Sequence, residues 1–158
     1  MKQFLVFFMV CTSMLVVNAQ AETGVLRSVF TTEVLNKEPV SELQKISTDT
    51  TRVYFFTEIN GLNGHTITHR WEYNGEVLAE VSFEIAANRW RTWSSKNMLA
   101  SWTGKWQVSV LDEGGNMIEQ NSFDYVVPEA QLEKGLSEST EEKTLVEEKL
   151  DTKPVNTQ

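Results

Sequence analysis

Alternation of apolar and polar residues is the dominant pattern in this chain. Trp106, Val108 and Val110 alternate with polar residues, which is typical of a strand with one buried face. Residues 52–59 are apolar on both alternating faces, which indicates a strand in the middle of a sheet. Other strands are predicted near 24–34, 65–73, 76–85, 89–95 and 117–127, whereas 39–51 has the weak periodicity of a connection. Seven or eight short strands predict an all-β fold, an antiparallel β-sandwich of the immunoglobulin-like type.

The strands at 65–73 and 76–85 also permit a prediction of register. In each of them, the odd-numbered residues form the more apolar face. A two-residue Asn74-Gly75 turn would set the polar face of one strand against the apolar face of the other. A three-residue loop, Tyr73-Asn74-Gly75, with Gly75 in the left-handed conformation, shifts the parity by one and places Trp71 opposite Val77. The sequence therefore predicts a bulged hairpin with a three-residue loop.

The first 21 residues have the pattern of a signal peptide. Lys2 precedes an apolar run from Phe4 to Val17, and Ala19-Gln20-Ala21 matches the small-x-small cleavage pattern. As a helix the run would reach about 21 Å, short of the roughly 30 Å hydrocarbon core, so a retained membrane anchor is the weaker alternative. We expect cleavage after Ala21 and a periplasmic or secreted protein.

Charge divides the remaining chain into a domain at 22–128 and a tail at 129–158. Residues 22–127 hold 9 Lys and Arg against 14 Asp and Glu, and residues 128–158 hold 4 against 8. The tail is predicted to be flexible, acidic and disordered, because large apolar residues are sparse after Pro128. The acidic balance argues against nucleic acid as a partner. The single cysteine, Cys11, lies in the apolar run, so no disulfide is expected after cleavage.

Several blocks of this sequence resemble a bacterial family, the Domain of Unknown Function 2914 family. The blocks are Val25–Thr32, Glu38–Val40, Val53–Glu58, His69–Gly75, Arg89–Lys96 and Gly104–Trp106. The resemblance runs from about Val25 to Val127 and leaves out the tail. It implies a small extracytoplasmic module with no established activity, so no functional residue can be carried over from it.

The residue patterns do not predict an enzyme, a metal site or a cofactor. His65 and His69 are four residues apart, but on a strand this spacing separates them by about 13 Å. No Gly-x-Ser-x-Gly elbow or Ser-x-x-Lys motif is present, although Ser94 and Lys96 are able to meet a histidine in space. A glycosidase-like carboxylate pair such as Glu58 with Glu72 is neither supported nor excluded by the sequence.

A cluster rich in tryptophan and arginine is the remaining candidate site. All five tryptophans lie between residues 71 and 106, and Trp71 and Trp106 are predicted to be core residues because they sit on apolar strand faces. The candidate residues not explained by a strand face are Arg89, Trp90, Arg91, Trp93, Lys96 and Trp102.

Two hypotheses from different classes fit this cluster. Exposed tryptophans stack on sugar rings and arginines bind carboxylates, which favours a cell-envelope module that binds an anionic glycan. The alternative is a protein-interaction or structural module, in which the cluster docks an envelope protein or seals the end of the sandwich by stacking arginine on tryptophan.

Overall fold

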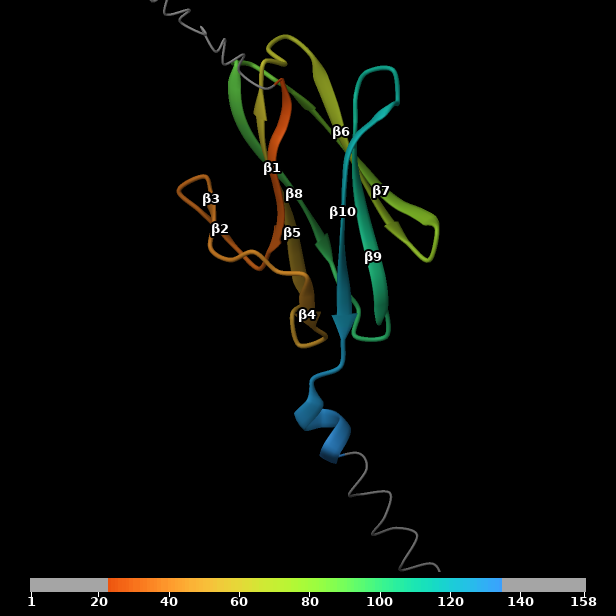
Figure 1. The fold of residues 1–158 in the computed structure, drawn as a ribbon. Coiled ribbons are helices and arrows are strands. Elements are labelled where there is room, and N and C mark those ends of the chain that lie inside the picture. The colour runs from red at the N-terminus through yellow and green to blue at the C-terminus, as the bar shows by residue number, and fades with distance from the viewer. Residues whose placement is uncertain (1–22, 135–158) are drawn as a thin grey trace, which may run out of the picture.

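Two β-sheets packed face to face make up the domain (Figure 1). The computed structural model describes residues 23–134. One sheet has the strand order β1-β5-β8, and the other has the order β4-β10-β9-β6-β7. A small β2-β3 hairpin lies beside β1 (Figure 1). The strands are β1 (Gly24–Thr31), β2 (Val34–Leu35), β3 (Glu38–Pro39), β4 (Lys45–Ser47), β5 (Arg52–Asn60), β6 (Thr66–Tyr73), β7 (Glu76–Glu84), β8 (Arg89–Asn97), β9 (Gly104–Leu111) and β10 (Met117–Val126).

This architecture confirms the predicted all-β sandwich. Seven of the strands have eight or more residues, as the alternation predicts. The difference lies between residues 34 and 47, where the structure has three further strands of two or three residues, and only Pro39 and β4 fall within the predicted connection at 39–51. One of them, β4, pairs with β10 in parallel, whereas the other strand pairs are antiparallel. Strands this short carry too little periodicity to be recognised in the sequence.

The core between the sheets follows the predicted alternation. Trp106, Val108 and Val110 on β9 have no exposed surface. The central strand β5 is covered on both faces, because Phe55 and Phe56 are consecutive residues and both are fully buried. The prediction of a β5 strand covered on both sides is therefore confirmed at Phe55 and Phe56. The apolar face of β9 is buried as predicted, but Ser109 on its polar face is also buried, so β9 is half-buried only in its first part.

The β6-β7 hairpin corrects the predicted register. Tyr73 pairs with Glu76 across a two-residue turn, so the predicted three-residue loop and the pairing of Trp71 with Val77 are wrong. A one-residue shift in the register is still needed to bring the two apolar faces together. It occurs as a β-bulge at Leu78, between the pairs Glu72↔Val77 and Trp71↔Ala79. The reason is local, since Asn-Gly strongly favours the two-residue turn with positive φ at both positions. The bulge then returns the apolar face to the core.

We expect Gly75→Val to lower the free energy of unfolding by at least about 1 kcal/mol. Gly75 has a φ of 81°, and a Cβ at this position would have no heavy atom beyond its chain neighbours within 4 Å. The cost therefore comes from the left-handed backbone and not from a clash. Urea unfolding measures it, with Gly75→Asn as the matched control because Asn tolerates this conformation. Equal stability of the Val and Asn variants would contradict the strained turn.

Residues 129–134 form a short exposed helix after β10 (Figure 1). Gln131 in this helix donates a hydrogen bond to Asp49 over 2.8 Å. The rest of the predicted tail, 135–158, and the predicted signal peptide lie outside the described residues. Within residues 23–134, no helix is both long and apolar enough to cross a membrane.

Candidate functional site

An open hollow lies where the turn between β2 and β3 approaches the start of β8. Its volume is about 530 Å³, and its lining residues are Lys37, Ala87, Arg89, Trp90, Arg91 and Trp93. The alternation of side chains along β8 explains why basic and aromatic residues occur together in this lining. Arg89, Arg91 and Trp93 all lie on the outer face of the sheet, where they pair with Asn60, Glu58 and Phe56 of β5. Trp90 lies on the opposite face and packs against the core. The hollow therefore combines basic and aromatic side chains on one strand.

The six residues predicted as a candidate site divide into two groups. Arg89, Trp90, Arg91 and Trp93 line the hollow together. Lys96 and Trp102 lie elsewhere, with the Lys96 ammonium donating to the Leu78 carbonyl over 3.2 Å and lying 6.0 Å from the Trp102 ring centroid.

Trp102 and Lys96 close the end of the sandwich near the start of β9. The Trp102 ring centroid lies 5.6 Å from that of Trp106, and Trp106 donates its indole N–H to the Trp102 carbonyl over 3.0 Å. Tyr73 stacks on Trp106 with a centroid distance of 4.8 Å and lies 6.5 Å from the Trp102 ring, so the three rings form one cluster. Lys96 and Trp102 therefore have the positions expected of residues that seal the end of the sandwich. The other four candidate residues line the open hollow.

The environment of Trp93 differs from that of the other tryptophans. Trp71 and Trp106 are fully buried, as predicted, and Trp90 and Trp102 pack against the core. Trp93 is half-buried on the outer face of the sheet, and within the described part of the chain it neither joins the core cluster nor contacts another ring. A half-exposed indole without a ring partner leaves a face on which a ligand can stack.

A buried carboxylate, Glu58, positions the two arginines of the hollow. Its side chain is 7% exposed; it accepts a short hydrogen bond from Arg89 Nε, and Arg91 Nε lies 3.4 Å from its Oε2. Burial by itself raises the pKa of Glu58, but the hydrogen bond from Arg89 and the charge of Arg91 outweigh it, so the pKa lies below its usual value. Glu58 is therefore ionised at neutral pH and fixes both guanidinium groups.

The two arginines differ in what they leave free. The side chain of Arg89 is 68% exposed, so its remaining N–H donors face solvent. Arg91 is 31% exposed and also pairs with Glu38 through Nη1 at 2.7 Å. Among residues 23–134, the Nε of Arg91 is a buried donor with no acceptor in hydrogen-bond geometry. Arg89 thus has donors available to a ligand, whereas Arg91 is held in ion pairs with Glu38 and Glu58 at the side of the hollow.

His69 lies in the core and not at the site. Its ring bridges Ser94 Oγ, 2.9 Å from Nδ1, and Thr57 Oγ1, 3.2 Å from Nε2. Trp71 donates its indole N–H to the same Ser94 oxygen over 2.9 Å, and the Thr57 hydroxyl donates to the Thr92 carbonyl. The neutral tautomer of His69 with its hydrogen on Nε2 satisfies every side chain in this hydrogen-bond network. Nε2 then donates to the Thr57 hydroxyl, and the Ser94 hydroxyl donates to Nδ1.

The contact between Ser94 and His69 has the atoms of a nucleophile and a base, but its environment opposes catalysis. Ser94 is 5% exposed and His69 is fully buried, so a substrate has no access to either group. Burial lowers the pKa of His69 to about 3, which makes it a weak base. Glu58 and Glu72 do not form a carboxylate pair. They lie in different sheets, and each alternates along its strand with residues that face the core, so the two side chains point to opposite outer faces of the sandwich. Both arrangements are structural.

We expect the free energy of unfolding to fall by about 2 kcal/mol as the pH decreases from 7.5 to 5. The unfolded chain binds a proton at His69 near pH 6.5, whereas burial keeps the folded ring neutral down to about pH 3. Stability from this residue is therefore complete above pH 6.5 and is lost as the pH falls below it. Denaturant unfolding at a series of pH values measures the slope.

Two variants isolate the contribution of His69 to that slope. His69→Gln should remove it, whereas His65→Gln should retain it, because the side chain of His65 is 59% exposed and pairs with the exposed Glu113. Glu58 adds little to this slope, because its pKa is lowered in the folded protein and an unfolded glutamate titrates mainly below this pH range. An unchanged slope in His69→Gln would show that another group is responsible.

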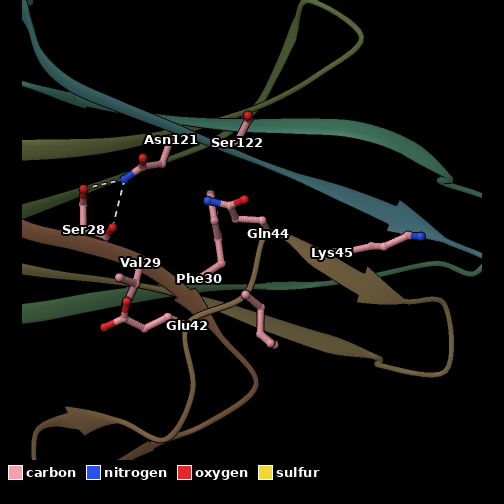
Figure 2. Close-up of a pocket in the computed structure, with 9 residues that line it drawn as sticks. Ser28, Val29, Phe30, Glu42, Gln44, Lys45, Asn121 and Ser122 are labelled. Carbon is pink, nitrogen blue, oxygen red and sulfur yellow. Dashed lines mark hydrogen bonds between the residues drawn. The ribbon is translucent and has the colours of Figure 1, made fainter.

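A second hollow, of about 610 Å³, lies between β1, β10 and the segment before β4 (Figure 2). Figure 2 shows Asn121 of β10 reaching Ser28 of β1, where its Nδ2 donates to the Ser28 carbonyl over 3.0 Å and also contacts the Ser28 hydroxyl. Glu42 at the rim of this hollow is paired with Arg27. The Asn121 contacts tie the two sheets together. Lys45 adds a cation to the lining, but no tryptophan lines this hollow, so it lacks the aromatic stacking face of the site at β8.

Sequence reasoning missed two residues of the site, Lys37 and the positioning residue Glu58. Lys37 is far from β8 in the sequence and reaches the hollow only because the β2-β3 hairpin folds beside the sheet. The available signal was the dipeptide Asn36-Lys37 between short extended segments, which has the length of a hairpin turn. Glu58 carried a signal too, as a charged residue within the most apolar strand.

The fold and the hollow together define a class of protein, an all-β sandwich module with a basic and aromatic surface site. Comparison with known families also finds a related family. Residues 64–125 match the family model described as Protein of unknown function (DUF2914), and the resemblance to this family is thereby confirmed. The match is shorter than the stretch from Val25 to Val127 on which the resemblance was noted, but it contains β6 to β9 and the four predicted residues of the hollow. No curated protein matches the chain.

Proposed function

We propose that this protein is an exported, non-catalytic binding module of the bacterial cell envelope, and that the hollow at β8 binds an anionic glycan. The observation that carries the proposal is the convergence of Trp93, Arg89 and Lys37 on one open hollow. A half-exposed indole offers a flat apolar face to a sugar ring, while exposed cations bind carboxylates. A concave site lined by aromatic side chains with a few convergent polar groups is the usual form of a small-ligand site.

The placement of the hollow on a rigid support favours binding over catalysis. Arg89 and Arg91 are fixed by the buried carboxylate of Glu58, and β8 pairs with β5 along its whole length. Preorganised side chains lose little conformational entropy when a ligand binds. The lining of the hollow consists of cations, aromatic rings and Ala87, which bind and orient a ligand, and it contains no histidine or carboxylate.

Export is supported by the sequence of the first 21 residues. The proposal predicts that the protein recovered from the envelope or secreted fraction begins at Glu22. Intact-mass analysis of that fraction tests the position of cleavage. A mass that corresponds to the uncleaved chain would contradict cleavage after Ala21 and would favour a protein that stays anchored through residues 1–21.

Calorimetric titration of the protein with a short oligogalacturonide tests the binding function. We expect saturable binding, and we expect Trp93→Ala to weaken it roughly tenfold, because loss of a stacked aromatic residue removes a central contact. Leu99→Ala is the matched control, since Leu99 is 54% exposed and lies beyond the other end of β8. The proposal fails if the wild type does not bind, or if Trp93→Ala and Leu99→Ala behave alike.

A second candidate function, binding of a protein segment as an added strand, rests on the free edge of β8. Met98 N donates to Thr51 O and Gly61 N donates to Asn88 O, so the even-numbered residues of β8 exchange backbone hydrogen bonds with β5. The odd-numbered residues consequently direct their backbone groups to the edge of the sheet, where an extended peptide can pair with them.

Ser95→Pro separates the two functions. It removes one outward N–H at an exposed edge position without altering a side chain of the hollow. Glycan binding should survive this substitution, whereas strand addition should not. Loss of oligogalacturonide binding in Ser95→Pro, with the fold intact, would favour recognition through the strand edge.

A further inference from the structure

The arginines of the outer sheet face belong to a chain of ion pairs whose charges cancel. Arginine and glutamate alternate along it in the order Glu42, Arg27, Glu38, Arg91, Glu58 and Arg89. Arg27 Nη1 lies 3.3 Å from Glu38 Oε2, and the next pair, Arg91 Nη1 with Glu38 Oε1, is separated by 2.7 Å. Three positive and three negative groups sum to zero. Arg89 and Arg91 therefore do not by themselves give the hollow a net positive charge.

Lys37 is the remaining charged residue in the lining of the hollow. It is exposed, and within residues 23–134 it forms no ion pair. Because the six-membered chain is neutral, the ammonium group of Lys37 supplies the excess positive charge. An anionic ligand would meet this charge at the side of the hollow formed by the β2-β3 turn.

The backbone at Lys37 is unusual for a lysine. Asn36 and Lys37 have φ values of 52° and 62°, so both central residues of this two-residue turn are left-handed. The β6-β7 hairpin has the same kind of turn, Asn74-Gly75, with φ values of 51° and 81°. Glycine adopts this conformation without strain, whereas a lysine does so at a steric cost. The strained position is compatible with a role for the side chain in binding.

We infer that Lys37 supplies the net positive charge of the hollow and makes the site select sugars that carry a carboxylate over the same sugars without one. This inference rests on the proposed function, since stacking on Trp93 is available to charged and neutral sugar rings alike. An exposed ion pair changes affinity by up to roughly fivefold. We therefore expect a preference of about threefold to fivefold for the acid at low salt, decreasing as salt is added.

The test compares an oligogalacturonide with its methyl ester, which retains the sugar rings and removes the charges. The full chain should bind the acid about threefold to fivefold more tightly than the ester at low ionic strength. Lys37→Gly should abolish this preference without lowering Tm, because glycine suits the left-handed turn. Lys37→Arg, which restores the charge, should recover the preference.

The outcomes separate this inference from the proposed function. If the wild type binds acid and ester equally, or if Lys37→Gly retains the preference, Lys37 does not select the carboxylate although the hollow still binds glycan. If neither ligand binds, the proposed function fails and the inference fails with it. A preference that Lys37→Gly removes and Lys37→Arg restores supports both.

Discussion

Replacing Trp71 by alanine is expected to lower the free energy of unfolding by about 3 to 5 kcal/mol, which is enough to unfold many domains of this size. The Trp71 side chain has no exposed surface, and its ring lies 6.2 Å from that of Phe30 in the opposite sheet. Its indole N–H also donates to Ser94, which in turn contacts His69. The substitution therefore creates a cavity and removes one donor from a buried hydrogen-bond chain.

Related substitutions separate these two contributions in chemical denaturation. Trp71→Phe keeps an aromatic ring but loses the donor and part of the volume, so we expect a smaller total cost, of which the lost donor contributes about 1 to 2 kcal/mol. Trp106→Ala should resemble Trp71→Ala, because Trp106 is also fully buried and stacks on Tyr73. Trp93→Ala should cost less than about 1.5 kcal/mol. Equal losses for Trp71→Ala and Trp93→Ala would contradict the division between core and site.

The double substitution Arg89→Ala with Arg91→Ala is expected to cost about 3 to 5 kcal/mol of stability. Both arginines contact the nearly buried carboxylate of Glu58. Without either partner, that carboxylate is a buried charge with no compensation. Loss of ligand binding in this double variant would therefore not identify a binding role.

Glu58→Gln provides the control for this interpretation. In the double-substituted background it removes the stranded charge, and we expect it to recover most of the lost stability. Acidification should act in the same direction, since burial without the arginines raises the pKa of Glu58 and protonation then removes the charge. The gap in unfolding free energy between wild type and the double variant should therefore narrow as the pH falls. A double variant as stable as wild type would show that the ion pairs contribute nothing.

The sequence predicts the long strands well because each carries enough alternation to define a buried face. Val108 and Val110 are fully buried as the pattern indicates. The bulge at Leu78 could not be located, because alternation shows that parity must shift between two strands but does not show where. The parallel strand β4 has only three residues, and its pairing with β10 depends on contacts distant in sequence.

The candidate site was predictable in part for a related reason. Trp93 and Arg89 stand out because they lie close together in the sequence without belonging to an apolar face. Trp102 carries the same signal, but it packs against Trp106 at the end of the sandwich, and composition alone cannot distinguish an indole that seals a fold from one that faces a hollow. Lys37 reaches the site through tertiary structure alone.

Two-dimensional NMR of the tryptophan indole N–H groups tests the central claim most directly. The chain has five tryptophans, so each indole provides one reporter at a known place in the fold. On titration with an oligogalacturonide, the signals of Trp93 and Trp90 should shift progressively to saturation, while those of Trp71, Trp102 and Trp106 should stay in place. Shifts confined to Trp102, or no shift in any indole signal, would contradict binding in the hollow at β8.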